Sequence, residues 1–83
     1  MVKQYVPVLL YIGADGGITP KKVKAGLEGE WLRVIKVTGS RRMASLKAGA
    51  VGIRYTCIVN YYETQKKVYL FDEGQKWFIE GGE

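Results

Sequence analysis

The sequence predicts an all-β fold, a small barrel of the SH3-like or OB-like kind with five to six short strands. Within runs of β-forming residues, apolar and polar side chains alternate with a period of two. Turns containing glycine separate these runs. Six such runs, each a candidate strand, fit within 83 residues. Sheets this small avoid exposed edges by closing into barrels, so a barrel is the first expectation. A curved open sheet or a small sandwich is the alternative.

The expected strands follow one another with turns between them. Pro7 cannot donate a hydrogen bond to a ladder and so predicts an edge or a bulge in the first strand. Asp15-Gly16 is a strong hairpin signal. Trp31, Val34 and Val37 do not alternate cleanly with their neighbours, which predicts a bulge or burial on both faces. The expected strands are residues 4–12, 18–25, 30–38, 53–62, 68–71 and 77–80, with turns at 14–17, 26–29, 63–66 and 72–75.

The strand expected at residues 53–62 is the longest and separates apolar from mixed positions. Its alternation puts two sets of residues on opposite faces. One set is Ile53, Tyr55, Cys57 and Val59, and the other is Arg54, Thr56, Ile58 and Asn60. The residues expected in the core of the barrel are Trp31, Tyr55, Phe71 and Trp77.

Composition predicts one soluble intracellular domain spanning residues 1–83. Of these residues 47% are hydrophobic, enough for a core, and 25% are charged. No apolar run has the 18 or so residues of a membrane span, and residues 1–12 lack the pattern of a signal peptide. Cys57 is the only cysteine and histidine is absent, so we expect no internal disulfide, no His/Cys zinc site and no cofactor. Together these features favour the cytoplasm of a cell or of an infected host.

Positive charge is concentrated in the middle of the chain. Residues 33–62 contain six basic residues and no acidic residue, within a net charge of +5. Four of the six are arginines, which suit bidentate contacts with phosphate. The block therefore predicts either an anion site or a solvated basic face that aids solubility.

Residues 39–52 are expected to form a long loop, with one helical turn at residues 43–47. Loops of this length are uncommon in compact domains and often have a function. The loop and the strand after it offer guanidinium groups, a hydroxyl, an ammonium and a flexible backbone, all of which bind phosphate. The candidate phosphate or nucleotide ligands are Arg41, Arg42, Ser45, Lys47, Gly49 and Arg54. The alternative is an ordinary surface loop.

Aromatic residues form a second candidate feature. Tyr61 and Tyr62 are the rings expected to be exposed, and basic residues such as Arg54 and Lys67 lie among the aromatics. Such a pattern is typical of platforms on which bases stack. The competing interpretation places most of these rings in the core.

Several absences argue against an enzyme. Without histidine the commonest general base is missing. Cys57 lies in mid-strand and is interpreted as a small buried hydrophobe. Asp72 and Glu73 are neighbours in a turn, where their side chains diverge. No P-loop motif or nucleophile elbow is present.

Five short segments resemble a group of short, uncharacterised bacterial and phage-like proteins. They are residues 18–20 (ITP), 44–49 (ASLKAG), 52–56 (GIRYT), 69–71 (YLF) and 77–80 (WFIE). The resemblance covers most of the chain and implies a small β fold in a prokaryotic or mobile-element setting. It implies no reaction. Residues 60–68 look longer than the tight hairpin of the group.

Three functions are consistent with these observations. The first is a non-catalytic module that binds nucleic acid or a nucleotide, in one form by sequestering a signalling nucleotide. The second is a protein-interaction module, such as a phage-type inhibitor or an accessory subunit that binds a host protein through a sheet edge near Pro7. The third is a homo-oligomeric assembly protein, because small barrels gain stability by pairing.

Overall fold

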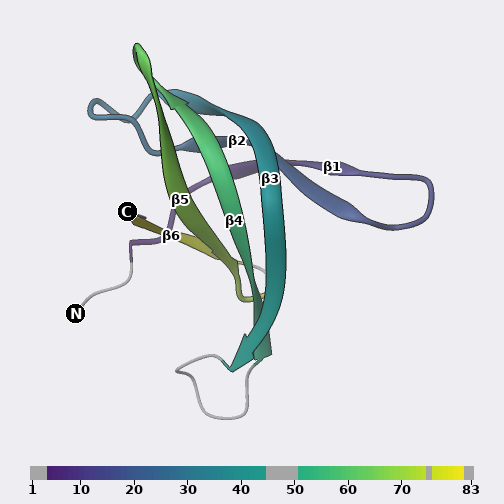
Figure 1. Cartoon of the computed structure of the whole chain (residues 1–83). Coiled ribbons are helices and arrows are strands. Elements are labelled where there is room, and N and C mark those ends of the chain that lie inside the picture. Colours follow the sequence, from purple (N-terminus) through teal and green to yellow (C-terminus); the bar gives the residue numbers. More distant parts are fainter. Residues whose placement is uncertain (1–3, 45–50, 75, 82–83) are drawn as a thin grey trace.

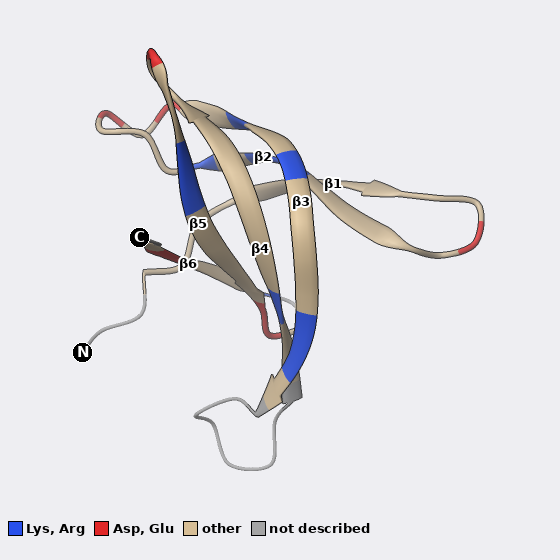
Figure 2. Ribbon diagram, viewed as in Figure 1, with Lys and Arg blue, Asp and Glu red and all other residues tan. Residues whose placement is uncertain are grey.

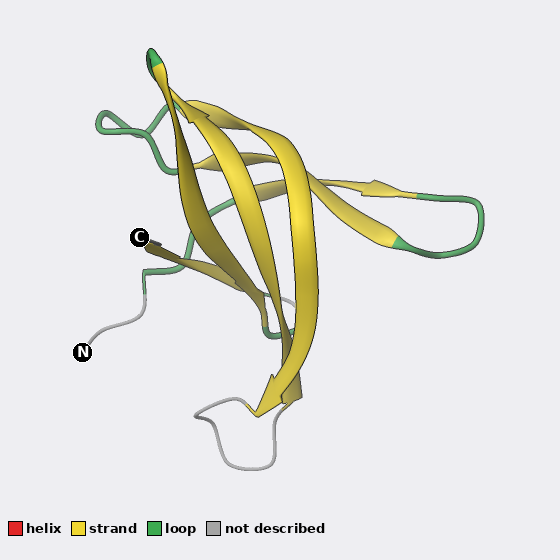
Figure 3. Ribbon diagram, in the orientation of Figure 1, coloured by secondary structure: helices red, strands yellow, loops and turns green. Residues whose placement is uncertain are grey.

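A computed structural model describes residues 4–44, 51–74 and 76–81, and all regular structure within them is β-strand (Figures 1 and 3). The strands are β1 (Val8–Ile12), β2 (Ile18–Lys24), β3 (Trp31–Ala44), β4 (Val51–Tyr61), β5 (Thr64–Asp72) and β6 (Trp77–Gly81). The all-β prediction is therefore confirmed. None of the described residues forms a helix long and apolar enough to span a membrane.

The six strands form one antiparallel sheet in the order β1-β2-β3-β4-β5-β6, so each strand pairs with its neighbours in the chain. The sheet curls into a half-barrel (Figure 1). The residues just before β1 contact β6, at the other end of the strand order, and so draw the two ends of the sheet together. Tyr5 forms a β-bridge with Phe78 of β6, and the Val6 N–H donates to the Trp77 carbonyl at 2.9 Å. On the other side, the Lys24 N–H donates to the Pro7 carbonyl at 2.9 Å.

β1 and β2 form a hairpin that projects from the half-barrel (Figure 1). Its turn is closed by the Gly13 N–H, which donates to the Gly17 carbonyl at 2.8 Å. Gly16 has φ +87°, a conformation that glycine adopts without steric cost. The predicted hairpin turn at residues 14–17 is confirmed. So is the predicted edge position of the first strand, which begins directly after Pro7.

The main core lies on one side of β3, β4 and β5, which we call the core face. Alternation along β4 buries Tyr55, Cys57 and Val59 there, as expected from the sequence. Tyr55 stacks on Trp77 with ring centroids 5.4 Å apart. Burial raises the pKa of the Cys57 thiol to about 11. The buried members of this cluster are Val23, Leu32, Val34, Tyr55, Cys57, Val59, Val68, Leu70 and Trp77.

A smaller aromatic cluster lies on the opposite side of β4 and β5, which we call the outer face. Phe71 and Phe78 stack with ring centroids 4.9 Å apart, and Tyr5 packs edge-on against Phe78 at 5.9 Å. The Phe71 ring lies over Gly52. A Cβ on Gly52 would collide with that ring and would lie 2.7 Å from the Asp72 carbonyl. Glycine is therefore required at this position to let the ring reach the sheet.

The predicted loop at residues 39–52 is wrong in extent. β3 continues to Ala44, and β4 begins at Val51. The predicted helical turn at residues 43–47 is wrong for Met43 and Ala44, which belong to β3. The rest of that turn lies outside the described residues. The predicted bulge is confirmed, because the β3–β4 register shifts between Val34 and Lys36 and again between Val37 and Gly39.

Three of the four expected core aromatics are buried, although Phe71 belongs to the outer cluster. The exception is Trp31, which is 41% exposed. Leu32 and Val34 occupy the core face of β3, and alternation puts Trp31 on the other side. The turn between β4 and β5 is also tighter than expected from residues 63–66. Tyr61 pairs directly with Thr64, which leaves only two residues in the turn.

Candidate anion-binding surface

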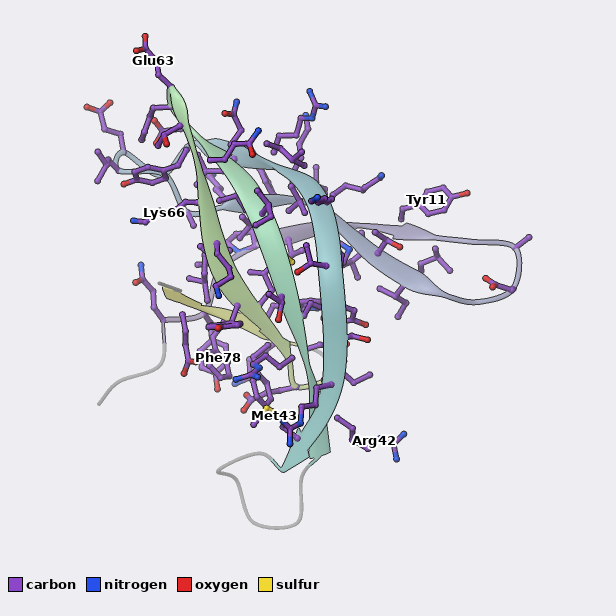
Figure 4. The ribbon with its side chains drawn as sticks, in the orientation of Figure 1. Tyr11, Arg42, Met43, Glu63, Lys66 and Phe78 are labelled. Carbon is purple, nitrogen blue, oxygen red and sulfur yellow. The ribbon has the colours of Figure 1, made fainter. Side chains whose placement is uncertain are left out.

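Strand register places the predicted phosphate ligands on different faces. Arg41 and Arg42 are adjacent in β3, so their side chains leave the sheet on opposite sides. Arg41 lies opposite Arg54 of β4, whereas Arg42 lies opposite Ile53 on the core face. Figure 4 shows Arg42 and its neighbour Met43 leaving the end of β3 in different directions. The structure therefore unites Arg41 with Arg54 and separates Arg42 from both. Ser45, Lys47 and Gly49 lie outside the described residues.

Two further lysines lie on the same face as Arg41 and Arg54. Lys36 of β3 lies opposite Ile58 of β4, which in turn lies opposite Lys67 of β5. Directly opposed residues of an antiparallel pair point to the same side of the sheet. Ile58 shares its side with Arg54, so both lysines belong to the outer face. We call Lys36, Arg41, Arg54, Lys67 and Tyr69 the basic face.

Tyr69 holds the Arg54 side chain against the sheet. The Arg54 Cζ lies 4.6 Å from the centroid of the Tyr69 ring, within the range of a cation–π contact. The Lys67 Nζ lies 5.9 Å from the same centroid. The Arg54 Nε is buried and has no hydrogen-bond partner among the described residues. A buried donor without an acceptor costs about 1–3 kcal/mol.

β3, β4 and β5 place no carboxylate on the side of the basic face. Asp72 is the only carboxylate on β3, β4 or β5. It lies opposite Ile53 and Trp77, in register with the core face. Glu80 of β6 lies opposite Tyr69 and therefore on the same side of the sheet, next to the basic face. Figure 2 shows most carboxylates at the turns, while basic segments lie along the strands.

Like charges directly opposed across two strands are destabilising. Arg41 and Arg54 are such a pair. Their repulsion is relieved when an anion lies between or above them, and a guanidinium binds phosphate through two parallel hydrogen bonds. The pair therefore points to a phosphate-type ligand more specifically than net charge does.

Tyr62, one of the two predicted stacking rings, is held by hydrogen bonds within the protein. Its hydroxyl donates to Glu30 Oε2 at 2.7 Å and accepts the Leu27 N–H at 2.8 Å. The Glu28 N–H donates to Glu30 Oε1 at 2.9 Å. The hydrogen bond from Tyr62 lowers the pKa of Glu30 and raises that of Tyr62 itself. Tyr62 thus ties the β4–β5 turn to the turn at residues 26–29.

Tyr62 also has φ +62°, which is rare for a bulky residue and needs compensating contacts. Tyr61, the other predicted ring, packs edge-on against Tyr62 at 4.7 Å, and the Lys66 Nζ lies 4.6 Å from the Tyr61 centroid. Both tyrosines are engaged in structural contacts at the end of the sheet. Neither adjoins Arg41 or Arg54 in the β3–β4–β5 register.

Sequence patterns did not single out Tyr69 or Lys36 as site residues. Tyr69 lies two positions from Phe71 and could be taken for another core ring. The missing information is the β4–β5 register, which sets Tyr69 opposite Thr56 and so beside Arg54. The alternation of β4 was available from the sequence, but the register between distant strands was not.

No protein-family model, curated protein or solved structure matches the chain. In residues 4–44, 51–74 and 76–81, no group of three or more His, Cys, Asp or Glu side chains could hold a metal ion. The chemistry of the basic face is therefore that of fixed cations beside one aromatic ring. Such groups bind and orient an anion.

Proposed function

We propose that the protein is a non-catalytic module that binds a phosphate-bearing polyanion, a nucleic acid, on the basic face. The observation that carries this proposal is the Arg41–Arg54 pair. These two arginines face each other, and Arg54 is fixed on Tyr69 at 4.6 Å. β3, β4 and β5 supply no carboxylate on that side, and Glu80 of β6 is the neighbouring one. A phosphate-bearing ligand would supply further compensating charge to the four cations.

The spread of the four cations favours a chain of phosphates over a single one. The Lys36–Ile58–Lys67 row and the Arg41–Arg54 row lie four residues apart along β4. At about 3.4 Å per residue they are about 14 Å apart, more than one phosphate group spans. Phosphate contacts of this kind fix orientation without reading sequence. A single nucleotide held at the Arg41–Arg54 row is the alternative ligand.

The order of the strands favours one kind of small barrel. Every strand of the curled sheet pairs with its chain neighbour, as in a meander. The OB-fold is a Greek-key barrel. The meander therefore favours the SH3-like over the OB-like form of small barrel, and in it the basic face covers the outside of β3, β4 and β5.

Fluorescence anisotropy with labelled oligonucleotides at several salt concentrations tests the proposal. If all four cations contact phosphates, the logarithm of the association constant should fall with the logarithm of salt concentration at a slope of about −3 for a single strand. Absence of binding at low salt would overturn the nucleic-acid form. Thermal shifts with nucleotides would then test the single-nucleotide form, since a ligand of the folded state raises its melting temperature.

A second candidate function is the addition of a partner strand to the free edge of β1. The observation that favours it is the exposure of large apolar side chains along the β1–β2 hairpin, with Ile12 64% exposed. Exposed strand edges recruit other chains through backbone hydrogen bonds. A host protein or a second copy of this chain could provide such a strand.

A further inference from the structure

The β1–β2 hairpin, which we call the arm, exposes an unusual amount of apolar surface. Tyr11 and Ile12 are 58% and 64% exposed, and Leu9 is 49% exposed. The other large apolar side chains that the arm exposes are Leu10 and Ile18. Alternation places these residues on both faces of the hairpin. Figure 1 shows the ribbon of this hairpin projecting from the half-barrel. Pro20, which pairs with Leu10, is fully buried. Exposed apolar surface of this kind marks an interaction site.

The arm also ends in an unprotected strand edge. β1 is the first strand of the sheet order, and its only strand neighbour among the described residues is β2. Soluble proteins usually protect such edges with charged side chains. β1 (VLLYI) has no charged residue. An apolar, uncharged strand suits this edge, and β1 of a second copy is such a strand.

We infer that two copies of the chain associate by antiparallel pairing of their β1 strands, which joins the two sheets across a two-fold axis. With Leu10 at the axis, Leu10 lies opposite Leu10 of the second copy. Val8 then lies opposite Ile12, and Leu9 opposite Tyr11. Directly opposed residues share a face, so every cross-strand pair is apolar. Val8 already packs against the main core, and the second copy's Ile12 would extend that core.

Charge at the two ends of the arm supports the same arrangement. Asp15 lies at the tip, while Lys22 and Lys24 lie on β2 near its base, opposite Leu9 and beside Val8. Antiparallel pairing brings the tip of each arm to the base of the other. It therefore brings a carboxylate of one copy to the end of the partner's arm that holds Lys22 and Lys24, one strand beyond β1, twice by symmetry. A nucleic acid gains nothing from the uncharged β1 edge and would bind elsewhere.

Sedimentation velocity with matched variants tests the dimer. The wild type should sediment as a dimer at micromolar concentrations. Tyr11→Lys and Ile12→Lys should each weaken dimerisation at least about a hundredfold, because symmetry puts two charges into an apolar interface. Leu27→Lys is the control, because Leu27 is 78% exposed and lies outside the arm. Circular dichroism should show that all three variants fold.

A monomeric wild type at the highest soluble concentration would overturn the inference. So would a dimer that survives both arm substitutions, or one that Leu27→Lys disrupts equally. A wild-type monomer whose arm substitutions abolish capture of another protein would instead assign the arm to a different occupant.

Cross-linking tests the register independently. Leu10→Cys should form an intermolecular disulfide on mild oxidation, because the two thiols would meet at the axis. Leu27→Cys should not. Cys57 does not interfere, since it is buried with its pKa raised to about 11. A Leu27→Cys variant that cross-links as fast as Leu10→Cys would contradict pairing at β1.

Discussion

The β3–β5 body and the β1–β2 arm use similar apolar residues with opposite results. In the body, alternation buries Leu70 completely and leaves charged side chains outside. In the arm, Leu9, Leu10 and Ile12 remain exposed although β1 pairs with β2. Val8 lies at the boundary between the buried and the exposed region, since it still packs against the main core. The comparison shows that similar apolar side chains are buried where the sheet curls around them and exposed where the hairpin projects (Figure 1).

The largest expected effect separates a core residue of the body from an exposed residue of the arm. Leu70→Ala should lower the free energy of unfolding by about 2–5 kcal/mol, because it creates a cavity at a fully buried position. Ile12→Ala should change the free energy of unfolding of the monomer by less than about 0.5 kcal/mol. Urea unfolding at protein concentrations too low for dimerisation measures the free energy of unfolding of both variants. Equal losses would show that the arm packs against the body.

A smaller effect should distinguish two glycines of the body. Gly52→Ala should destabilise by about 1–3 kcal/mol, because its Cβ would collide with the Phe71 ring and the Asp72 carbonyl. Gly39→Ala is the matched control in β3, since a Cβ there meets nothing within 4 Å. Thermal unfolding of the two variants measures the difference. If both are equally stable, the outer aromatic cluster does not depend on close approach at Gly52.

The contacts of Tyr62 should have a smaller, pH-dependent effect. Tyr62→Phe removes the hydroxyl that binds Glu30 and Leu27. Because this bond lowers the pKa of Glu30 from 4.5, its stabilisation is complete above that pH and is lost as pH falls through the lowered pKa. Because it raises the pKa of Tyr62 from 10.0, the stabilisation is also lost as pH rises past that value.

The difference in melting temperature between wild type and Tyr62→Phe should therefore be largest at neutral pH and shrink at both extremes. Tyr61→Phe is the control, because Tyr61 is the neighbouring ring and contacts Lys66 through its face. A difference that does not vary with pH would assign the effect to packing of the Tyr62 ring rather than to its hydroxyl.

Much of the fold could be predicted because its signals are local. Hairpin turns at residues 14–17 and 26–29 and the two faces of β4 follow from glycine positions and period-two alternation. The predicted loop at residues 39–52 failed because Gly39, Ser40 and two adjacent arginines favour a loop locally. Pairing of residues 39–44 with residues 51–56 outweighs that local preference.

The candidate site was predicted only in part, because local signals do not specify the register between strands. Arg41 and Arg54 are among the predicted ligands, and the structure places them together. Arg42 was grouped with them by sequence proximity, but neighbours in a strand point to opposite faces. Tyr69 was missed because its position beside Arg54 depends on the register of two strands, which no single segment specifies.

The most direct test of the basic face compares Arg41→Glu with Arg42→Glu in the anisotropy assay. The two substitutions change the net charge equally at adjacent, exposed positions, and they differ only in the face of the sheet that they alter. Arg41→Glu should weaken oligonucleotide binding at least about tenfold and make the salt dependence less steep, because phosphate contacts on the basic face are lost. Arg42→Glu should retain most of the affinity. Equal losses in the two variants would contradict a binding site on the outer face of β3, β4 and β5.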